Sequence, residues 1–172
     1  MNETLKTLKE RRSCRKYLAK QVDAEALDLI LEAGTYAPTG MNRQSPIMVA
    51  IQDAQTIRLL EKENAKVLGN EAATPFYGAP TLVVVFADTR CRTGFEDACL
   101  VMGNLLNAAS ILGIGSCWIH RAKQMFETEE GKELLRKWGL KDTLVGVGNC
   151  ILGYPDEEPQ ARPRLDGRIV KI

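Results

Sequence analysis

Hydrophobic residues recur at helical spacing in five stretches of the chain. Leu27, Ile30 and Leu31, for example, fall on one side of a helix, and Asp23 precedes them as a typical amino-terminal cap. Gly139 is the kind of residue that ends a helix. The pattern predicts helices over residues 3–11, 24–36, 54–68, 97–112 and 128–139.

Shorter and continuously apolar stretches predict the strands. The run TLVVVFA at residues 81–87 has no polar side, so we expect a strand that is covered on both faces. Further strands are predicted over residues 47–51, 116–120 and 143–152. Because no repeat or linker interrupts these elements, we expect one α+β domain over residues 1–172, with helices on both faces of a central sheet.

The predicted helix at residues 97–112 is apolar on nearly every side. After Asp97 its polar residues are all uncharged, namely Asn104, Asn107 and Ser110. A helix of this kind is buried nearly all round, whereas a helix on one sheet of a small domain normally keeps one side in water. We therefore infer that a partner covers that side, and the simplest partner is a second copy of the chain.

The end of the chain is polar and rich in turn-forming residues. It closes with the strand-like sequence RIVKI at residues 168–172. Such a tail has too little apolar surface to fold as a unit by itself. It can instead add an edge strand to a sheet, either in its own subunit or in a partner.

Composition and charge exclude several classes of protein. The 172 residues are 45% hydrophobic and 26% charged, which excludes disorder or a coiled coil as the main state. The net charge of +1 provides no general attraction to nucleic acid or to an anionic membrane. No apolar run reaches the roughly 18 residues of a membrane helix, and the first residues lack the apolar core of a signal peptide. We expect a cytoplasmic protein.

Side chains that perform catalysis unaided are scarce. The chain has one histidine, His120, and five cysteines without CxxC spacing. We therefore expect no metal site and no histidine-assisted nucleophile. For the thiols, a reduced and mostly buried state is favoured over a redox role. If the protein is an enzyme, a bound cofactor is expected to carry the chemistry.

Two segments have the composition of binding sites. The first is the cluster of Arg11, Arg12, Ser13 and Arg15, because guanidinium groups match the geometry of phosphate. The second is the segment 38–46, whose amide side chains can hydrogen-bond a flat heterocycle. The plainer alternatives are a solvated basic turn and an ordinary loop. Arg162 and Arg164 in the tail become relevant only if they meet the first cluster.

Four motifs follow one another along the chain. They are RRSCRKY at 11–17, APTGMNRQSP at 37–46, NLLNAA through LGIGSCWI at 104–119, and GYP at 153–155 with the later Arg162-x-Arg164. Each motif is weak alone, but the four in this order are fairly specific. Together they resemble the nitroreductase family of FMN-dependent flavoenzymes over essentially the full length of the chain.

The resemblance implies a nitroreductase-like fold with a central mixed or antiparallel sheet flanked by helices. It also implies a homodimer in which the C-terminal strand is exchanged and two FMN sites lie at the interface. Arg11, Arg12 and Ser13 would hold the phosphate and ribityl chain, helped by Arg162 and Arg164, and Arg15 would approach the pyrimidine edge. The partner would contribute Pro38, Thr39, Asn42 and Gln44, and the backbone of Ile119, His120 and Arg121 would face flavin N5.

The function implied is an FMN-dependent oxidoreductase. It would take a hydride from NADH or NADPH and reduce a flat, electron-poor acceptor, such as a nitroaromatic or a quinone, in a ping-pong cycle. Phe76 and Tyr77 are expected to form the wall of the substrate pocket. The alternatives are a flavin-binding module for storage or regulation, another flavin reaction such as dehalogenation or enoate reduction, and a structural dimer without flavin.

Overall fold

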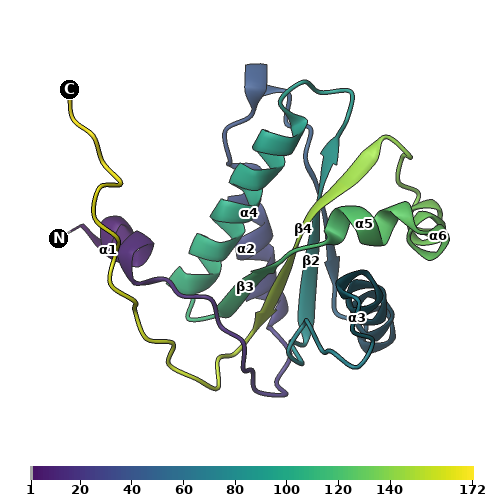
Figure 1. Cartoon of the computed structure of the whole chain (residues 1–172), viewed down its shortest axis with the longest axis horizontal. Helices are drawn as coiled ribbons and strands as arrows, with labels where there is room; N and C mark the ends of the chain where they lie inside the picture. Colours follow the sequence, from purple (N-terminus) through teal and green to yellow (C-terminus); the bar gives the residue numbers. More distant parts are fainter. Residues whose placement is uncertain (1) are drawn as a thin grey trace.

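The structure is a computed structural model that describes residues 2–172 (Figure 1). The helices are α1 (Glu3–Glu10), α2 (Ala24–Thr35), the 3-10 turn η1 (Gly40–Asn42), α3 (Ala54–Leu68), α4 (Gly94–Ile111), α5 (Ala122–Glu127) and α6 (Glu129–Lys137). The strands are β1 (Ile47–Ile51), β2 (Thr81–Asp88), β3 (Gly115–Ile119) and β4 (Leu144–Gly153).

The four strands form one antiparallel sheet in the order β1-β2-β4-β3. β2 lies between β1 and β4, and all eight of its residues are buried. Because side chains alternate along a strand, Leu82 and Val84 enter one core cluster while Val83 and Val85 enter the other. The sheet therefore separates two hydrophobic cores, as the apolar run of β2 predicted.

Helices cover both faces of the sheet. Side chains of α2 and α4, such as Ile30 and Leu105, fill the core on one face. Side chains of α3, α5 and α6, such as Leu60 and Met125, fill the core on the other face. Figure 1 shows α2 and α4 on one side of β2 and β4, and α3 on the other. The predicted α+β class is confirmed, and the sheet is antiparallel.

Helix α4 keeps an open side within the single chain. Val101, Met102 and Leu105 are buried against the sheet, whereas Leu100 is 48% and Ile111 is 64% exposed. The sequence predicts burial on nearly every side of this helix. The exposed apolar face is therefore the surface on which a partner is expected.

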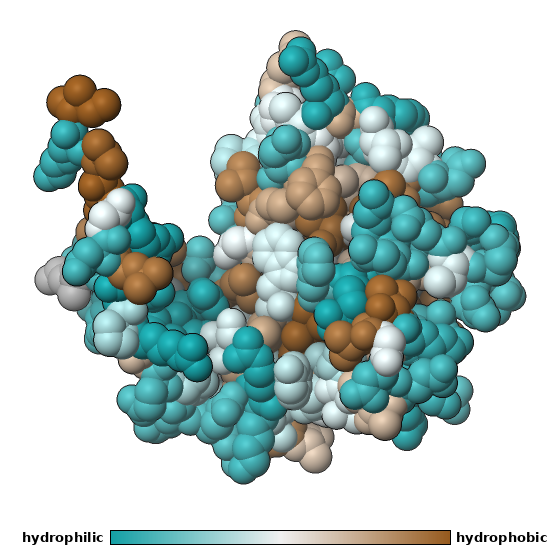
Figure 2. Space-filling model, in the orientation of Figure 1, coloured by the Kyte–Doolittle hydropathy of each residue, from teal (hydrophilic) through white to brown (hydrophobic). Residues whose placement is uncertain are grey.

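The structure differs from the sequence-based expectations at two places. The short helix α5 was not predicted, because it has six residues and its N-cap Arg121 makes no side-chain capping bond. Residues 168–172 form no strand within the described chain. Ile169 and Val170 are about four-fifths exposed. Figure 2 shows the tail standing apart from the body of the molecule. The tail therefore does not extend the sheet of its own subunit.

Candidate functional site

The arginine segment lies along the free edge of β3. Ser13 forms a parallel bridge with Ser116, and the Cys14 N–H donates to the Ser116 carbonyl over 2.9 Å. Gly115 permits this approach, because a Cβ there would lie 2.9 Å from the Cys14 Sγ. The Tyr17 hydroxyl then donates to the Cys14 carbonyl over 2.6 Å. Residues 11–17 are thus held against the sheet.

Two hollows open along this edge. The larger has a volume of about 460 Å³ and is lined by Arg15, Tyr77 and the backbone region from Cys117 to Arg121. The smaller has a volume of about 270 Å³ and is lined by Arg11, Arg12 and Gly115, among others. The segment 11–17 therefore places its first two arginines on one hollow and Arg15 on the other.

The arginines of this segment differ in their contacts. The Arg12 Nη1 donates to the carbonyls of Lys9 and Arg11, over 2.8 and 2.7 Å. The Arg11 Nη1 is buried and has no hydrogen-bond partner among the described residues. A buried, charged donor without an acceptor is costly, so the Arg11 Nη1 is an unsatisfied group beneath this edge of the sheet.

Carboxylates from the start of the tail share the smaller hollow. Glu157 and Glu158 line it, and the Glu157 carboxylate accepts a hydrogen bond from the Arg15 N–H. The same tail carries Arg162 and Arg164 further along the chain.

The turn after β3 has an unusual backbone conformation. Arg121 has φ of 76° and ψ of 7°, a left-handed geometry that is rare for a residue with a side chain. The Arg121 Nε donates to the Asn64 Oδ1 over 3.0 Å, and the Asn64 Nδ2 donates to the His120 carbonyl over 2.8 Å. The Asn149 Nδ2 also donates to the Ile119 and His120 carbonyls, at 3.3 Å each.

Asn64 and Asn149 are functional candidates that the sequence reasoning missed. Both are fully buried, and they come from α3 and β4. Neither belongs to one of the four motifs, and an isolated asparagine carries no distinctive signal in a sequence. A buried polar residue in an apolar strand, GNCIL at 148–152, was the one local hint at Asn149.

The loop that contains Pro38, Thr39, Asn42 and Gln44 lies elsewhere. It lines neither hollow, and Figure 1 shows η1 at the opposite end of α4 from α1. The loop is nevertheless sharply shaped, because Met41, Asn42 and Gln44 all have positive φ. The Gly40 N–H donates to the buried Asp97 over 3.0 Å, which ties the loop to the start of α4.

The tail arginines also lie outside the two hollows. Arg162 and Arg164 are exposed and line neither of them. No hydrogen bond or ion pair joins them to the cluster at 11–15 within residues 2–172. The single chain therefore places Arg11 and Arg12 on one hollow and Arg15 with the turn at 119–121 on the other, while Ser13 lies between them against β3. The chain leaves the loop and the tail apart from them.

The two aromatic residues proposed for the pocket wall have different positions. Tyr77 lines the larger hollow and is 43% exposed. Phe76 is 1% exposed, belongs to the core beneath the sheet and does not line this hollow. Phe76 is therefore a core residue and does not form the wall of the pocket, contrary to the prediction. The Phe76 N–H donates to the Glu61 carboxylate over 2.8 Å, and the Phe76 ring packs in the core.

The thiols near the site are buried. Burial raises the pKa of the Cys14 thiol, and it raises the pKa of Cys150 to about 12. All five cysteines are free. A raised pKa keeps a thiol protonated and unreactive. These two cysteines therefore have the character of core residues.

Comparison with known proteins identifies the family of the chain. It belongs to the nitroreductase family, whose family model matches residues 8–154. The chain is 29% identical to a nitroreductase with bound FMN from Bacteroides fragilis, with a TM-score of 0.93 and full coverage of both chains. A nitroreductase with bound FMN from Desulfitobacterium hafniense is 25% identical, with a TM-score of 0.90 and coverage of 100% and 99%.

A curated relative adds a named activity. An FMN reductase [NAD(P)H] from Bacillus subtilis is 26% identical over 193 residues, which covers 99% of this chain and 73% of the relative. The family resemblance noted from the motifs is confirmed by these matches. Among the described residues, no helix is both long and apolar enough to cross a membrane.

Proposed function

We propose that this member of the nitroreductase family is an FMN-dependent oxidoreductase that uses NADH or NADPH to reduce a flat, electron-poor acceptor. The observation that carries the proposal is the arginine segment 11–17, which is fixed along β3 with Arg11 and Arg12 on the smaller hollow and Arg15 on the larger. The FMN bound to relatives of the same fold supports it. When bound, FMN supplies two-electron chemistry, by which reduction by the nicotinamide and oxidation by the acceptor alternate in a ping-pong cycle.

The arginines of the segment suit a phosphate by charge, and the carboxylates of Glu10, Glu157 and Glu158 line the same smaller hollow. Arg11, Arg12 and Ser13 would hold the phosphate and the ribityl chain at the smaller hollow. Arg15 would place positive charge at the pyrimidine edge, where it favours the anionic reduced cofactor. The turn at 119–121 would present its main chain, so the identity of His120 is not critical. Tyr77 would limit the space for the second substrate.

The remaining contacts would come from a second copy of the chain. In the proposed homodimer, Pro38, Thr39, Asn42 and Gln44 reach the site of the partner subunit, and the tail with Arg162 and Arg164 is exchanged. The exposed apolar face of α4 supports this assembly. So does the distance in the fold between the loop and the hollows, since neither hollow is lined by these four residues.

The decisive experiment is an absorption spectrum of the purified protein, taken before and after anaerobic addition of NADH and then NADPH. We expect flavin bands that bleach with at least one nucleotide and recover on addition of a quinone or a nitroaromatic. Bands that persist with both nucleotides would support the flavin-binding module instead. Protein that takes up no FMN from solution would refute the proposal.

The kinetic pattern tests the cycle separately. A ping-pong mechanism predicts parallel lines in double-reciprocal plots when both substrates are varied. Intersecting lines would contradict it. Anaerobic product analysis with a halogenated aromatic and with an enoate distinguishes nitro or quinone reduction from the other flavin reactions.

A further inference from the structure

The backbone of the β3–α5 turn is held in a conformation that it would not adopt alone. The left-handed geometry of Arg121 is unfavourable for a residue with a side chain. Such a conformation persists only where the surroundings fix it. Here the fixing groups are the amides of Asn64 and Asn149, both of which donate to the His120 carbonyl.

The orientation of that carbonyl determines where the next N–H points. In a planar trans peptide, the C=O and the N–H that follows it point in opposite directions. The His120 carbonyl faces the two buried asparagines, so the Arg121 N–H is directed away from them. Within residues 2–172 no acceptor is bonded to this N–H. His120 and Arg121 both line the larger hollow.

Stability alone does not account for this arrangement. The Asn149 Oδ1 is buried without a hydrogen-bond partner among the described residues, which destabilises the fold. Asn149 also occupies the buried central part of β4, where a β-branched residue would suit the strand better. Two unfavourable features therefore occur together, because the strained Arg121 lines the hollow and Asn149, with its unbonded oxygen, contacts the same turn from the core.

We propose that Asn64 and Asn149 are positioning residues that fix the 120–121 peptide so that the Arg121 N–H is a preset donor to the ligand of the larger hollow. The inference rests on the proposed function, in which that ligand is the flavin ring. Asn64 acts through the backbone and touches no substrate. The Asn64 Oδ1 also accepts a hydrogen bond from the Arg121 Nε over 3.0 Å, which holds the side chain of Arg121 at the same turn.

The test compares Asn64→Leu with a matched control, Asn104→Leu. Asn104 also donates from its Nδ2 to a backbone carbonyl, that of Ala33 over 3.0 Å, but it lies on α4. With FMN bound, we expect Asn64→Leu to shift the visible flavin bands and to slow anaerobic reduction about ten-fold, the effect of one lost hydrogen bond. FMN affinity should change less than about three-fold, because the phosphate contacts remain. The control should keep the wild-type bands and rate.

A third variant separates the two bonds of Asn64. Asn64→Asp retains an acceptor for Arg121 but loses the donor to the His120 carbonyl. We expect it to behave like Asn64→Leu. Wild-type bands and reduction rate in Asn64→Asp would overturn the inference, because the carbonyl bond would then be irrelevant.

The flavin-free protein provides a readout that does not depend on activity. Backbone NMR of the apoprotein is expected to show shifted amide resonances at 120–122 in Asn64→Leu and unchanged ones in Asn104→Leu. Unchanged resonances in both would overturn the inference even if the variant lost activity. If the wild-type chain takes up no FMN, the proposed function fails, and the apoprotein spectra alone decide whether Asn64 holds the turn.

Discussion

At the scale of single residues, two hydrogen-bond donors near the candidate site have no acceptor within residues 2–172. The buried Arg11 Nη1 and the Arg121 N–H both lack a partner among the described residues, and the residues that carry them line the two hollows along β3. Cys14, which lines the smaller hollow, has a pKa raised by burial and is therefore a poor nucleophile. This agrees with a protein whose reactive group is a cofactor.

Removal of the Arg11 guanidinium should weaken FMN binding. We expect Arg11→Ala to lose about 1.5–3 kcal/mol of binding free energy, the contribution of a hydrogen bond to a charged group. Fluorescence titration of the apoprotein with FMN measures it. Arg136→Ala, an exposed arginine on α6, serves as the control and should bind normally. Equal affinities in the two variants would remove Arg11 from the site.

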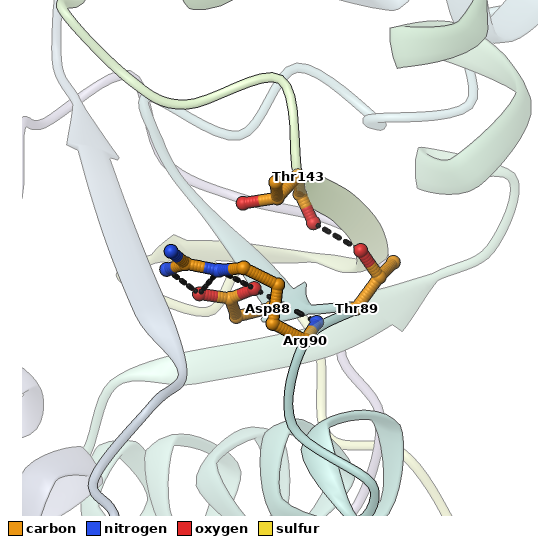
Figure 3. Close-up of polar contacts among 4 residues, drawn as sticks. All are labelled: Asp88, Thr89, Arg90 and Thr143. Atoms are coloured by element: carbon orange, nitrogen blue, oxygen red, sulfur yellow. Dashed lines mark hydrogen bonds and ion pairs between the residues drawn. The ribbon is translucent and has the colours of Figure 1, made fainter.

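At the scale of elements, short polar contacts hold the ends of the sheet in register. Figure 3 shows the Asp88 carboxylate paired with the Arg90 guanidinium, beside the Thr89 hydroxyl that donates to the Thr143 carbonyl over 2.9 Å. The Arg90 Nε lies 3.0 and 3.1 Å from the two Asp88 oxygens. These contacts close the end of β2 against the start of β4 and lead the chain toward α4.

Acid should weaken this contact. The side chain and the backbone N–H of Arg90 hold the pKa of the Asp88 carboxyl far below its ordinary value of 3.8. A lowered folded-state pKa gives stability that is present above the unfolded-state pKa and lost as the pH falls below it. We therefore expect wild type to exceed Asp88→Asn in urea midpoint near neutral pH, and the difference to shrink below about pH 4.

Urea unfolding monitored by circular dichroism at several pH values tests this expectation. Asp166→Asn, which alters an exposed carboxylate in the tail, should follow the wild type at every pH. A difference between wild type and Asp88→Asn that stays constant down to pH 2 would show that the ion pair is not the cause.

At the scale of the whole molecule, the single chain leaves parts of the proposed site far from one another. The loop at 38–44 and the tail lie away from the hollows, and α4 exposes Leu100 and Ile111. The homodimer that we propose would account for the positions of the loop and the tail and for the exposed face of α4. It would cover the apolar face of α4, bring the loop to the partner's hollow and give the tail a surface on which to pack.

Deletion of residues 159–172 should destabilise that dimer. The tail includes Ile169, Val170 and Ile172, which are almost fully exposed in the single chain and gain burial only on another surface. Sedimentation velocity over a concentration series is expected to show dissociation of the truncated form at concentrations where the full chain stays dimeric. An equally stable truncated dimer would contradict strand exchange.

Most elements could be predicted because their signals are local. Asp53 caps α3 by accepting from the Thr56 N–H, and Thr128 caps α6 in the same way, as their sequences indicate. Helix α5 could not be predicted, because it has six residues and no side-chain cap. Phe76 and Tyr77 show the same limit within the site. Their order in the sequence does not tell which ring enters the core.

The sequence by itself determined the class of the fold, the two-sided burial of β2 and the motifs that mark the nitroreductase family. These depend on periodicity and on residues close together in the chain. Only the tertiary structure decided that Asn64 and Asn149 meet at the His120 carbonyl, and that Glu157 reaches the Arg15 N–H. The residues in these contacts are 29, 56 and 142 positions apart in the chain. They follow from how the packed elements meet, because no local pattern in the chain encodes them.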